Sequence, residues 1–266
     1  MWRVGRILLA GDAAHQMPPF LGQGMCSGIR DALNLSWRLD MILSGRRTAD
    51  LLDSYQSERD PHVRAVIVKG IELGRVQTMR DSAAAAQRDA DLIAKRLRRA
   101  KPEKIRFPPL GDGEFGGGPG ARELMIQGFG RRLGRRDRFD ALFGYGPIVL
   151  ARRGAGGSIG VEERQSLDRA GIKLVEIDAD DGRDALEDED GAYEQWFAEH
   201  DCHVAAVRPD FHVWGTASAD RSSIGKLVAS FATFAATARK APLRGLGNAA
   251  PRTEAETRCE ASANRV

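Results

Sequence analysis

Residues 5–15 of the chain read GRILLAGDAAH, and residues 18–28 read PPFLGQGMCSG. The apolar run over residues 3–10 has the length of a strand and stops at Gly11 and Asp12, where turn-forming residues begin, which predicts a buried strand. A buried parallel strand needs neighbours on both sides and a crossover connection to reach them. We therefore expect that a segment upstream of this strand is missing.

A long helix is predicted next. Apolar residues recur at four-residue spacing between Met25 and Leu43, which is typical of a helix with a wide buried face. Gly22, Gln23 and Gly24 precede this helix, and the unpaired N–H groups of a helix start attract an anionic ligand. The simpler interpretation of an isolated Gly-x-Gly is a tight turn that permits close helix packing.

The carboxylate of Asp12 is the first candidate ligand group. It follows the predicted strand directly, at the sheet edge where ligands sit in open α/β folds. A carboxylate at this edge can accept two hydroxyl hydrogen bonds from a sugar-like chain, so Asp12 suits a polyol. The alternative is that Asp12 caps a turn or a helix.

The residues around Asp12 are predicted to shape and brace the loop. The Pro18–Pro19 pair fixes two φ angles and removes two backbone donors. His15 follows a turn, where a lone histidine is more often a hydrogen-bonded structural residue than a catalytic one. Asp31 and Asn34 are expected to tie the helix to its surroundings. We assign no catalytic side chain from the sequence.

These segments resemble a known flavoprotein motif. Over residues 5–15 and 18–28 the chain resembles the second FAD-binding motif of the FAD-dependent aromatic hydroxylases, which are single-component flavoprotein monooxygenases. The strongest likeness is to members that hydroxylate 3-(3-hydroxyphenyl)propionate, resorcinol or phenol. Further matching residues are Asp31, Ala32, Asn34, Leu35 and Trp37, and those expected to be structural in the following helix pair are Tyr55, Glu58, Arg59 and Pro61.

The resemblance implies FAD as the cofactor. In this family the residue that matches Asp12 holds the ribityl hydroxyls, and the residue that matches Pro19 lies beside the flavin and substrate rings. The backbone amides near Gly24 would stabilise negative charge on the reduced flavin. The cofactor-binding residues are therefore expected to be Gly11, Asp12, Pro19, Gly22, Gln23, Gly24 and Met25.

The resemblance also implies the reaction. Members of the family reduce FAD with NAD(P)H and hydroxylate a phenolic ring with O₂ through a C4a-hydroperoxyflavin. They begin with a Gly-rich nucleotide-binding unit that this chain lacks, so we expect the C-terminal portion of such an enzyme, in a truncated or split form. The expected partners are a second copy of the chain or a complementing N-terminal FAD-binding half. The alternative is a non-catalytic fragment, or a partner module that completes a flavin site on another chain.

The remaining sequence predicts an α/β fold in two domains. Helices are expected over residues 49–58, 61–79 and 83–99, before a Pro- and Gly-rich stretch at 101–120. Beyond it, strands are predicted at residues 147–151, 173–177, 203–208 and 211–214, and helices at 161–170, 192–200 and 223–239. The expected domains are the C-terminal segment of an FAD-binding (GR2-type) domain (1–100), a connector with the start of the second domain (101–146), a thioredoxin-like domain (147–239) and a disordered tail (240–266).

The second domain carries its own resemblance, through residues 139–144 and 207–211. These segments resemble the thioredoxin-like C-terminal domain of many such hydroxylases. The chain has three cysteines and no CxxC pair, so thiol exchange is not expected. The resemblance implies a structural or oligomeric role.

Charge and cysteine content exclude several classes of function. Forty Lys and Arg against 37 Asp and Glu give a net charge of +3 that is spread along the chain, which argues against nucleic acid. We find no membrane-spanning run and no signal peptide, and the scattered cysteines fit a reducing compartment, so we expect a cytoplasmic protein. The Gly-rich residues 154–160 miss the dinucleotide-binding spacing, and residues 178–189 lack the glycine of a calcium loop. No metal site is predicted.

Overall fold

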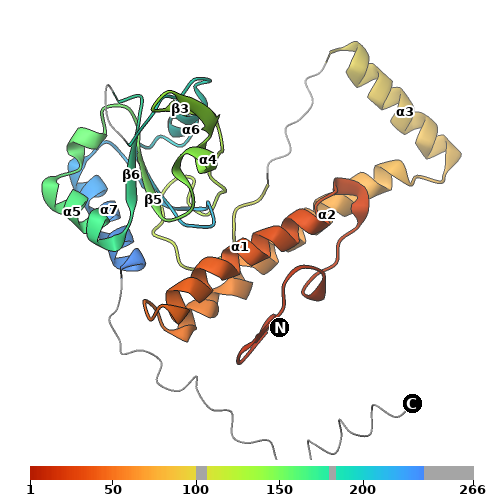
Figure 1. Ribbon diagram of the computed structural model, residues 1–266. Coiled ribbons are helices and arrows are strands. Elements are labelled where there is room, and N and C mark those ends of the chain that lie inside the picture. The colour runs from red at the N-terminus through yellow and green to blue at the C-terminus, as the bar shows by residue number, and fades with distance from the viewer. Residues whose placement is uncertain (100–106, 180–183, 237–266) are drawn as a thin grey trace, which may run out of the picture.

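The computed structural model describes residues 1–99, 107–179 and 184–236 (Figure 1). Two long helices, α1 (Gly24–Leu43) and α2 (Ser54–Gln77), form the N-terminal part, and a five-stranded sheet with its helices forms the C-terminal part. The predicted α/β class is therefore confirmed. The predicted tail at 240–266, residues 101–106 of the connector and residues 180–183 of the segment 178–189 lie outside the described residues.

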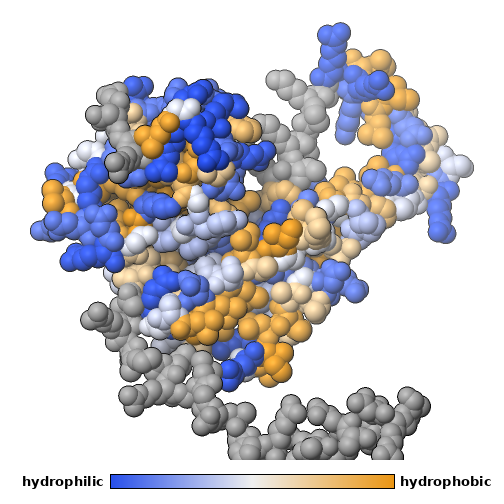
Figure 2. All heavy atoms as spheres, in the orientation of Figure 1, coloured by the Kyte–Doolittle hydropathy of each residue, from blue (hydrophilic) through white to orange (hydrophobic). Residues whose placement is uncertain are grey.

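The first strand differs from the prediction. Residues 3–8 form two short antiparallel strands, β1 (Arg3–Val4) and β2 (Ile7–Leu8), joined by a turn at Gly5. Val4 and Ile7 are 64% and 70% exposed, and Figure 2 shows apolar surface on this side of the molecule. The prediction of one buried strand over residues 3–10 is wrong, because the turn folds the run back on itself and an apolar run does not reveal that.

Helix α1 agrees with the prediction, whereas α2 replaces two predicted helices. The short 3-10 helix η3 (Ala49–Leu52) precedes α2, and Pro61 lies inside α2 instead of starting a new helix. Proline cannot donate a hydrogen bond to the carbonyl of Ser57. The next carbonyl, that of Glu58, accepts a hydrogen bond from Gly111 N at 2.8 Å, so a distant segment supports α2 near Pro61.

Helix α3 (Ser82–Leu97) agrees with the predicted helix over residues 83–99. Asp81 caps it, because the Asp81 carboxylate accepts a hydrogen bond from Ala84 N at 2.8 Å. Leu92 and Ile93 are 51% and 58% exposed, and the helix projects away from the other elements (Figure 1). None of its residues is buried. Of the helices in the described ranges, none combines the length and apolarity that crossing a bilayer requires.

The C-terminal sheet has the strand order β7-β6-β5-β8-β9. Strand β5 pairs parallel with β6 and antiparallel with β8, while β9 is antiparallel to β8 and β7 is parallel to β6. These strands are β5 (Ile148–Ala151), β6 (Lys173–Ile177), β7 (Ala185–Leu186), β8 (Val204–Val207) and β9 (Val213–Ala217). Strands β5, β6 and β8 were predicted close to these bounds. Strand β9, predicted at residues 211–214, begins later, because the turn before it occupies residues 208–212.

Helices cover both faces of this sheet. α5 (Val161–Ala170) and α7 (Arg221–Ala235) lie on one face, and α6 (Ala192–Glu199) and the short α4 (Phe139–Phe143) lie on the other (Figure 1). Alternate strand residues supply the two cores: Val149 joins the core with α5 and α7, and Leu150 joins the core with α4 and α6. The sequence did not predict α4, β7 or the hairpin of β3 (Phe129–Arg132) and β4 (Arg135–Arg138).

The described part of the Pro- and Gly-rich stretch, residues 107–120, forms no helix and is tied to both parts of the chain. Gly116 N donates a hydrogen bond to Trp214 O at 2.8 Å, and His62 of α2 contacts Pro108 O at 2.8 Å. On the α5–α7 side, Trp37 of α1 packs against Phe234 at 5.7 Å between ring centroids. The helical part and the sheet part therefore share one hydrophobic core.

Candidate functional site

Two glycines allow the Gly-Asp turn to lie against α1. The turn is the 3-10 helix η1 (Gly11–Ala13), and Gly11 has φ +58°, a left-handed conformation that favours glycine. A Cβ atom on Gly28 of α1 would lie 3.3 Å from Gly11 Cα, which is closer than such contacts normally are. Gly11 and Gly28 therefore set the distance between the turn and the helix.

Asp31 anchors this turn from α1. The Asp31 carboxylate is fully buried and accepts hydrogen bonds from Gly11 N at 2.9 Å and from Arg59 Nε at 2.8 Å. His15 Nε2 contacts the same carboxylate at 2.7 Å. The expectation that His15 is structural and that Asp31 ties the helix to its surroundings agrees with this geometry.

A buried ionic cluster joins the helices to the sheet part. Glu58 of α2 binds Arg208 at 2.9 Å and Arg38 of α1 at 2.7 Å, and Asp210 binds Arg208 at 2.7 Å. Asn34 donates to both Glu58 and Asp210, at 3.1 and 3.0 Å. All five side chains are fully or almost fully buried. The sequence indicated only that Asn34 and Glu58 are structural.

The charges of this cluster shift its pKa values. Burial alone would raise the pKa of Glu58, but Arg208 and Arg38 outweigh burial and lower it to about 2. The pKa of Asp210 is held well below its ordinary value, because Arg208 and His212 together outweigh burial. Burial, with a smaller contribution from Arg59, lowers the pKa of the nearby His62 to about 3. Glu58 and Asp210 are therefore ionised, and His62 is neutral, at neutral pH.

The proline pair and the glycines form the wall of a cavity in front of α1. Pro19 begins the 3-10 helix η2 (Pro19–Leu21), and Gly22 ends it with φ +64°. The cavity has a volume of about 470 Å³. Five of the seven predicted cofactor-binding residues line it: Asp12, Pro19, Gly22, Gly24 and Met25.

The two other predicted residues lie beside this cavity and do not line it. Gly11 packs behind the turn against Gly28, and the Gln23 side chain accepts a hydrogen bond from Arg30 at 3.2 Å. Gln16, Met17 and Pro18 line the cavity and were not among the predicted cofactor-binding residues. The only feature of the sequence that could have indicated them is their position between the predicted cofactor-binding residues Asp12 and Pro19.

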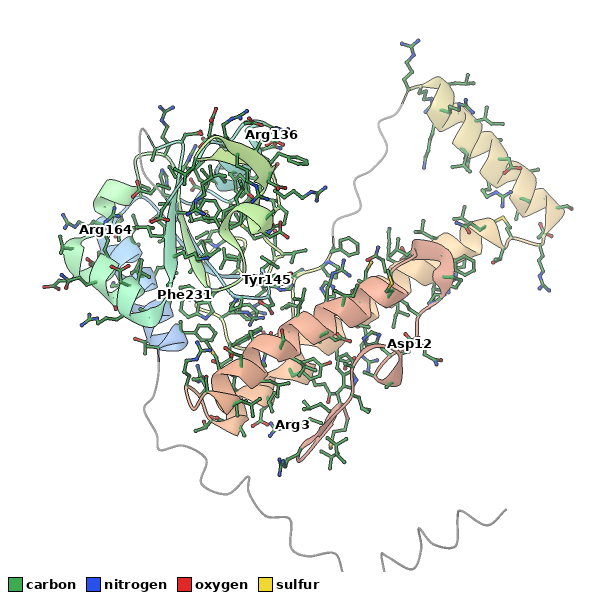
Figure 3. All side chains as sticks on the ribbon, viewed as in Figure 1. Arg3, Asp12, Arg136, Tyr145, Arg164 and Phe231 are labelled. Atoms are coloured by element: carbon green, nitrogen blue, oxygen red, sulfur yellow. The ribbon has the colours of Figure 1, made fainter. Side chains whose placement is uncertain are left out.

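The groups at the cavity are open to a ligand. No side chain caps the start of α1, so the first backbone N–H groups of the helix lack partners within it. Asp12 is exposed and makes no hydrogen bond or ion pair within the described ranges, so the structure does not support the alternative capping role. Figure 3 shows Asp12 on the side of the α1–α2 pair that faces away from the sheet.

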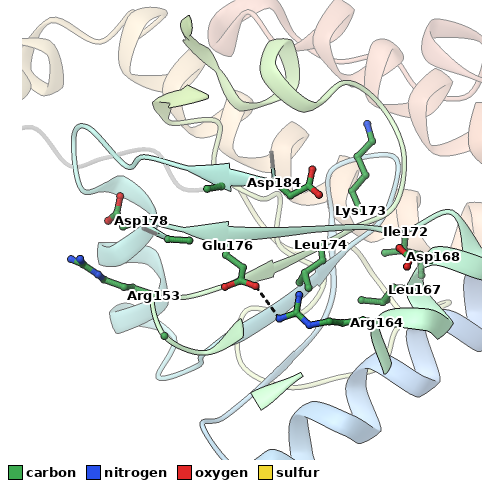
Figure 4. Close-up of a pocket in the computed structure, with 13 residues that line it drawn as sticks. Arg153, Arg164, Leu167, Asp168, Ile172, Lys173, Leu174, Glu176, Asp178 and Asp184 are labelled. Carbon is green, nitrogen blue, oxygen red and sulfur yellow. Dashed lines mark hydrogen bonds and ion pairs between the residues drawn. The ribbon is translucent and has the colours of Figure 1, made fainter. Parts of the chain in front are cut away.

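A larger cavity, of about 830 Å³, lies elsewhere, beside β6 and α5 (Figure 4). An ion pair of 3.0 Å between Arg164 and Glu176 crosses it. Glu176 also fills the space beside Gly156, where a Cβ would lie 2.1 Å from its carboxylate. Within the Gly-rich residues 154–160, Gly156 thus permits the close approach of Glu176. Burial raises the pKa of Cys202 to about 12, so this thiol is not activated.

Two family models match the chain. Residues 1–69 match the FAD binding domain, and residues 123–233 match the HcaD C-terminal domain. The first match contains the Gly-Asp turn, the cavity wall and Asp31. The second contains the sheet and most of its helices.

Sequence relatives point to the same family. A probable NADH-specific resorcinol 4-hydroxylase of Rhodococcus jostii (strain RHA1) is 48% identical over 87% of this chain and 44% of its own length. A 3-(3-hydroxy-phenyl)propionate/3-hydroxycinnamic acid hydroxylase of Comamonas testosteroni is 45% identical over 41% of this chain and 19% of its own length. The chain thus spans less than half of either relative.

A solved structure shares the fold. The flavin-dependent monooxygenase PieE, determined with FAD and substrate, aligns over 87% of this chain and 48% of its own with a TM-score of 0.60 and 21% identity. Over the matched residues, the chain is similar to FAD-dependent aromatic hydroxylases. Its relatives among them include resorcinol and 3-hydroxyphenylpropionate hydroxylases.

Proposed function

We propose that this chain forms one wall of the flavin site of an FAD-dependent aromatic hydroxylase. The proposal rests on the cavity at the start of α1, which Asp12, Pro19 and Gly24 line without blocking it. Space, an unpaired carboxylate and unpaired amides fit a ligand that is partly a polyol and partly anionic. FAD has both properties, so the described residues fit this cofactor.

Asp12 would hold the ribityl chain of FAD. Its carboxylate is exposed beside the cavity, and an ionised carboxylate accepts hydroxyl hydrogen bonds that are stronger than neutral ones. Asp31 holds the turn that presents Asp12, through Gly11 N. The position of the carboxylate is thus fixed by buried groups on α1 and α2.

The start of α1 would bind the pyrimidine end of the flavin. The amides of Gly24 and Met25 lie in the first turn of a 20-residue helix, whose dipole favours negative charge there. Gly22 has open space where a Cβ would be, so no side chain at this position blocks the approach. Pro19 and Gln23 complete the predicted contacts at the ring edge and the helix start.

Bound FAD would supply the oxygen activation and the redox chemistry, and the chain's residues would supply position and charge. We infer that the whole protein hydroxylates a phenolic substrate with O₂ and NAD(P)H, because its relatives include resorcinol and 3-hydroxyphenylpropionate hydroxylases. No side chain at the cavity serves as an evident base for the phenol. The domain division, a complementing N-terminal half or a second copy as partner, and the cytoplasmic location remain predictions.

Replacing Asp12 by alanine tests this role. We expect the affinity of the chain for FAD to fall by about 10- to 100-fold, because hydrogen bonds to a charged group contribute roughly 1.5–3 kcal/mol. The change should leave stability nearly unaltered, since Asp12 is exposed and unpaired in the described structure. Titrating FAD and following the anisotropy of flavin fluorescence measures the affinity.

Asp50→Ala is the matched control, because Asp50 is also exposed and also lies in the first turn of a 3-10 helix. It should bind FAD like the unchanged chain. An equal loss of FAD affinity in both variants, or unchanged FAD binding in Asp12→Ala, would show that Asp12 does not bind the flavin. A chain that binds no FAD at all would favour the alternative, a module whose flavin site is completed on another chain.

A further inference from the structure

A second, smaller cavity lies between α1 and the sheet part. Ile29 and Leu33 of α1 form one side, and Leu124 and Phe211 form the other. Its volume is about 260 Å³, and its exposed surface is mostly apolar. Pockets for drug-sized ligands measure roughly 300–1,000 Å³, so this cavity suits a single ring.

The ring of Phe211 is held in the cavity wall by a strained backbone. Phe211 has φ +63°, which an aromatic residue rarely adopts. Two hydrogen bonds fix this turn: Phe211 N donates to Arg208 O at 2.9 Å, and Met125 N donates to Phe211 O at 2.7 Å. The ring also packs on the exposed Tyr145, with 5.5 Å between the ring centroids. Strain of this kind concentrates at ligand sites.

The polar groups of the cavity favour a hydroxyl donor. Asp140 and Gln127 lie together in the lining, since Asp140 N donates to Gln127 Oε1 at 3.1 Å. A carboxylate such as Asp140 accepts a hydrogen bond from a hydroxyl and repels an anionic ligand. Arg30, also in the lining, already donates to Gln23 at 3.2 Å. Asp210 and His212 also belong to the lining, and Asp210 is already engaged by Arg208. The lining thus combines apolar walls with the acceptor Asp140.

We propose that this cavity binds a single-ring phenol, with the ring between Leu33 and Phe211 and the hydroxyl donated to Asp140. The site is distinct from the flavin wall, because the two cavities share no lining residue. The phenol contacts α1 and the sheet part together, so its binding stabilises their contact. This binding does not depend on FAD.

Methionine methyl groups report on both cavities separately. Met125 lines the phenol cavity, whereas Met17 and Met25 line the flavin wall. With ¹³C-methyl-methionine labelling of the full chain, resorcinol should shift the Met125 resonance saturably at millimolar concentration. Met17, Met25 and the buried Met41 should remain unchanged. Shifts at Met17 or Met25 without Met125, or no saturable shift, would overturn the proposal.

Filling the cavity provides the matched test. Leu33→Phe should weaken resorcinol binding at Met125 by about tenfold or more. Leu43→Phe, at the exposed end of the same helix, should not change it. Leu124→Phe fills the cavity from the other side, and it replaces Leu33→Phe in this test if the Leu33→Phe protein does not fold. Unchanged binding in both filled variants would refute the site, and benzoate binding as tightly as resorcinol would refute the role of Asp140.

Discussion

Replacing Glu58 by alanine should lower the free energy of unfolding by about 3–5 kcal/mol, because it leaves two buried arginines without their shared partner. Glu58 binds Arg38 at 2.7 Å and Arg208 at 2.9 Å, and these side chains are fully buried. Urea unfolding monitored by circular dichroism measures the change. Glu72→Ala, on the exposed part of the same helix, should change stability by no more than about 0.5 kcal/mol.

The pH dependence provides a second check on Glu58. Its pKa in the folded protein is about 2, below the ordinary value of 4.5. Its contribution is therefore complete above about pH 4.5 and is lost as the pH falls towards 2. The stability of Glu58→Ala should fall less steeply across this range. A stability loss as small as that of Glu72→Ala would show that the cluster does not hold the two parts together.

Asp31→Ala should be the second large loss, also about 3–5 kcal/mol, because it leaves Arg59 as an uncompensated buried charge. It also removes the acceptor of Gly11 N, so the turn that presents Asp12 should loosen. Amide hydrogen exchange of residues 11–15 should accelerate together with the loss of stability. Asp40→Ala, on the exposed side of the same helix, is the control. Unaltered amide hydrogen exchange at residues 11–15 would show that Asp31 does not stabilise the turn.

Local patterns predicted much of this fold. The four-residue spacing of α1 and the apolar runs of β5, β6 and β8 correspond to regular elements close to their expected bounds. Such elements follow from burial of one face, which the sequence records directly. The β3–β4 hairpin was missed because its strands are rich in arginine and only partly buried. The turn at Leu133 and Gly134 was the available signal.

Long-range contacts account for what the sequence did not show. Glu58 and Arg208 are 150 residues apart, and no spacing rule links them. Likewise, α2 continues through Pro61, and the distant Gly111 donates a hydrogen bond to Glu58 O beside that proline. At the candidate site, motif residues such as Asp12 and Pro19 were predicted because they are adjacent in sequence. The phenol cavity unites residues from four stretches of the sequence, so it became visible only in three dimensions.

The most direct test of the flavin wall is the footprint of FAD on the methionine methyl groups. FAD added to the labelled chain should shift Met17 and Met25, which line the cavity at the start of α1. It should leave Met41 in the helical core and Met125 in the phenol cavity unchanged. In Asp12→Ala the same shifts should require more FAD. If Met17 and Met25 stay unchanged at millimolar FAD, or if only Met125 responds, the cavity is not a flavin site.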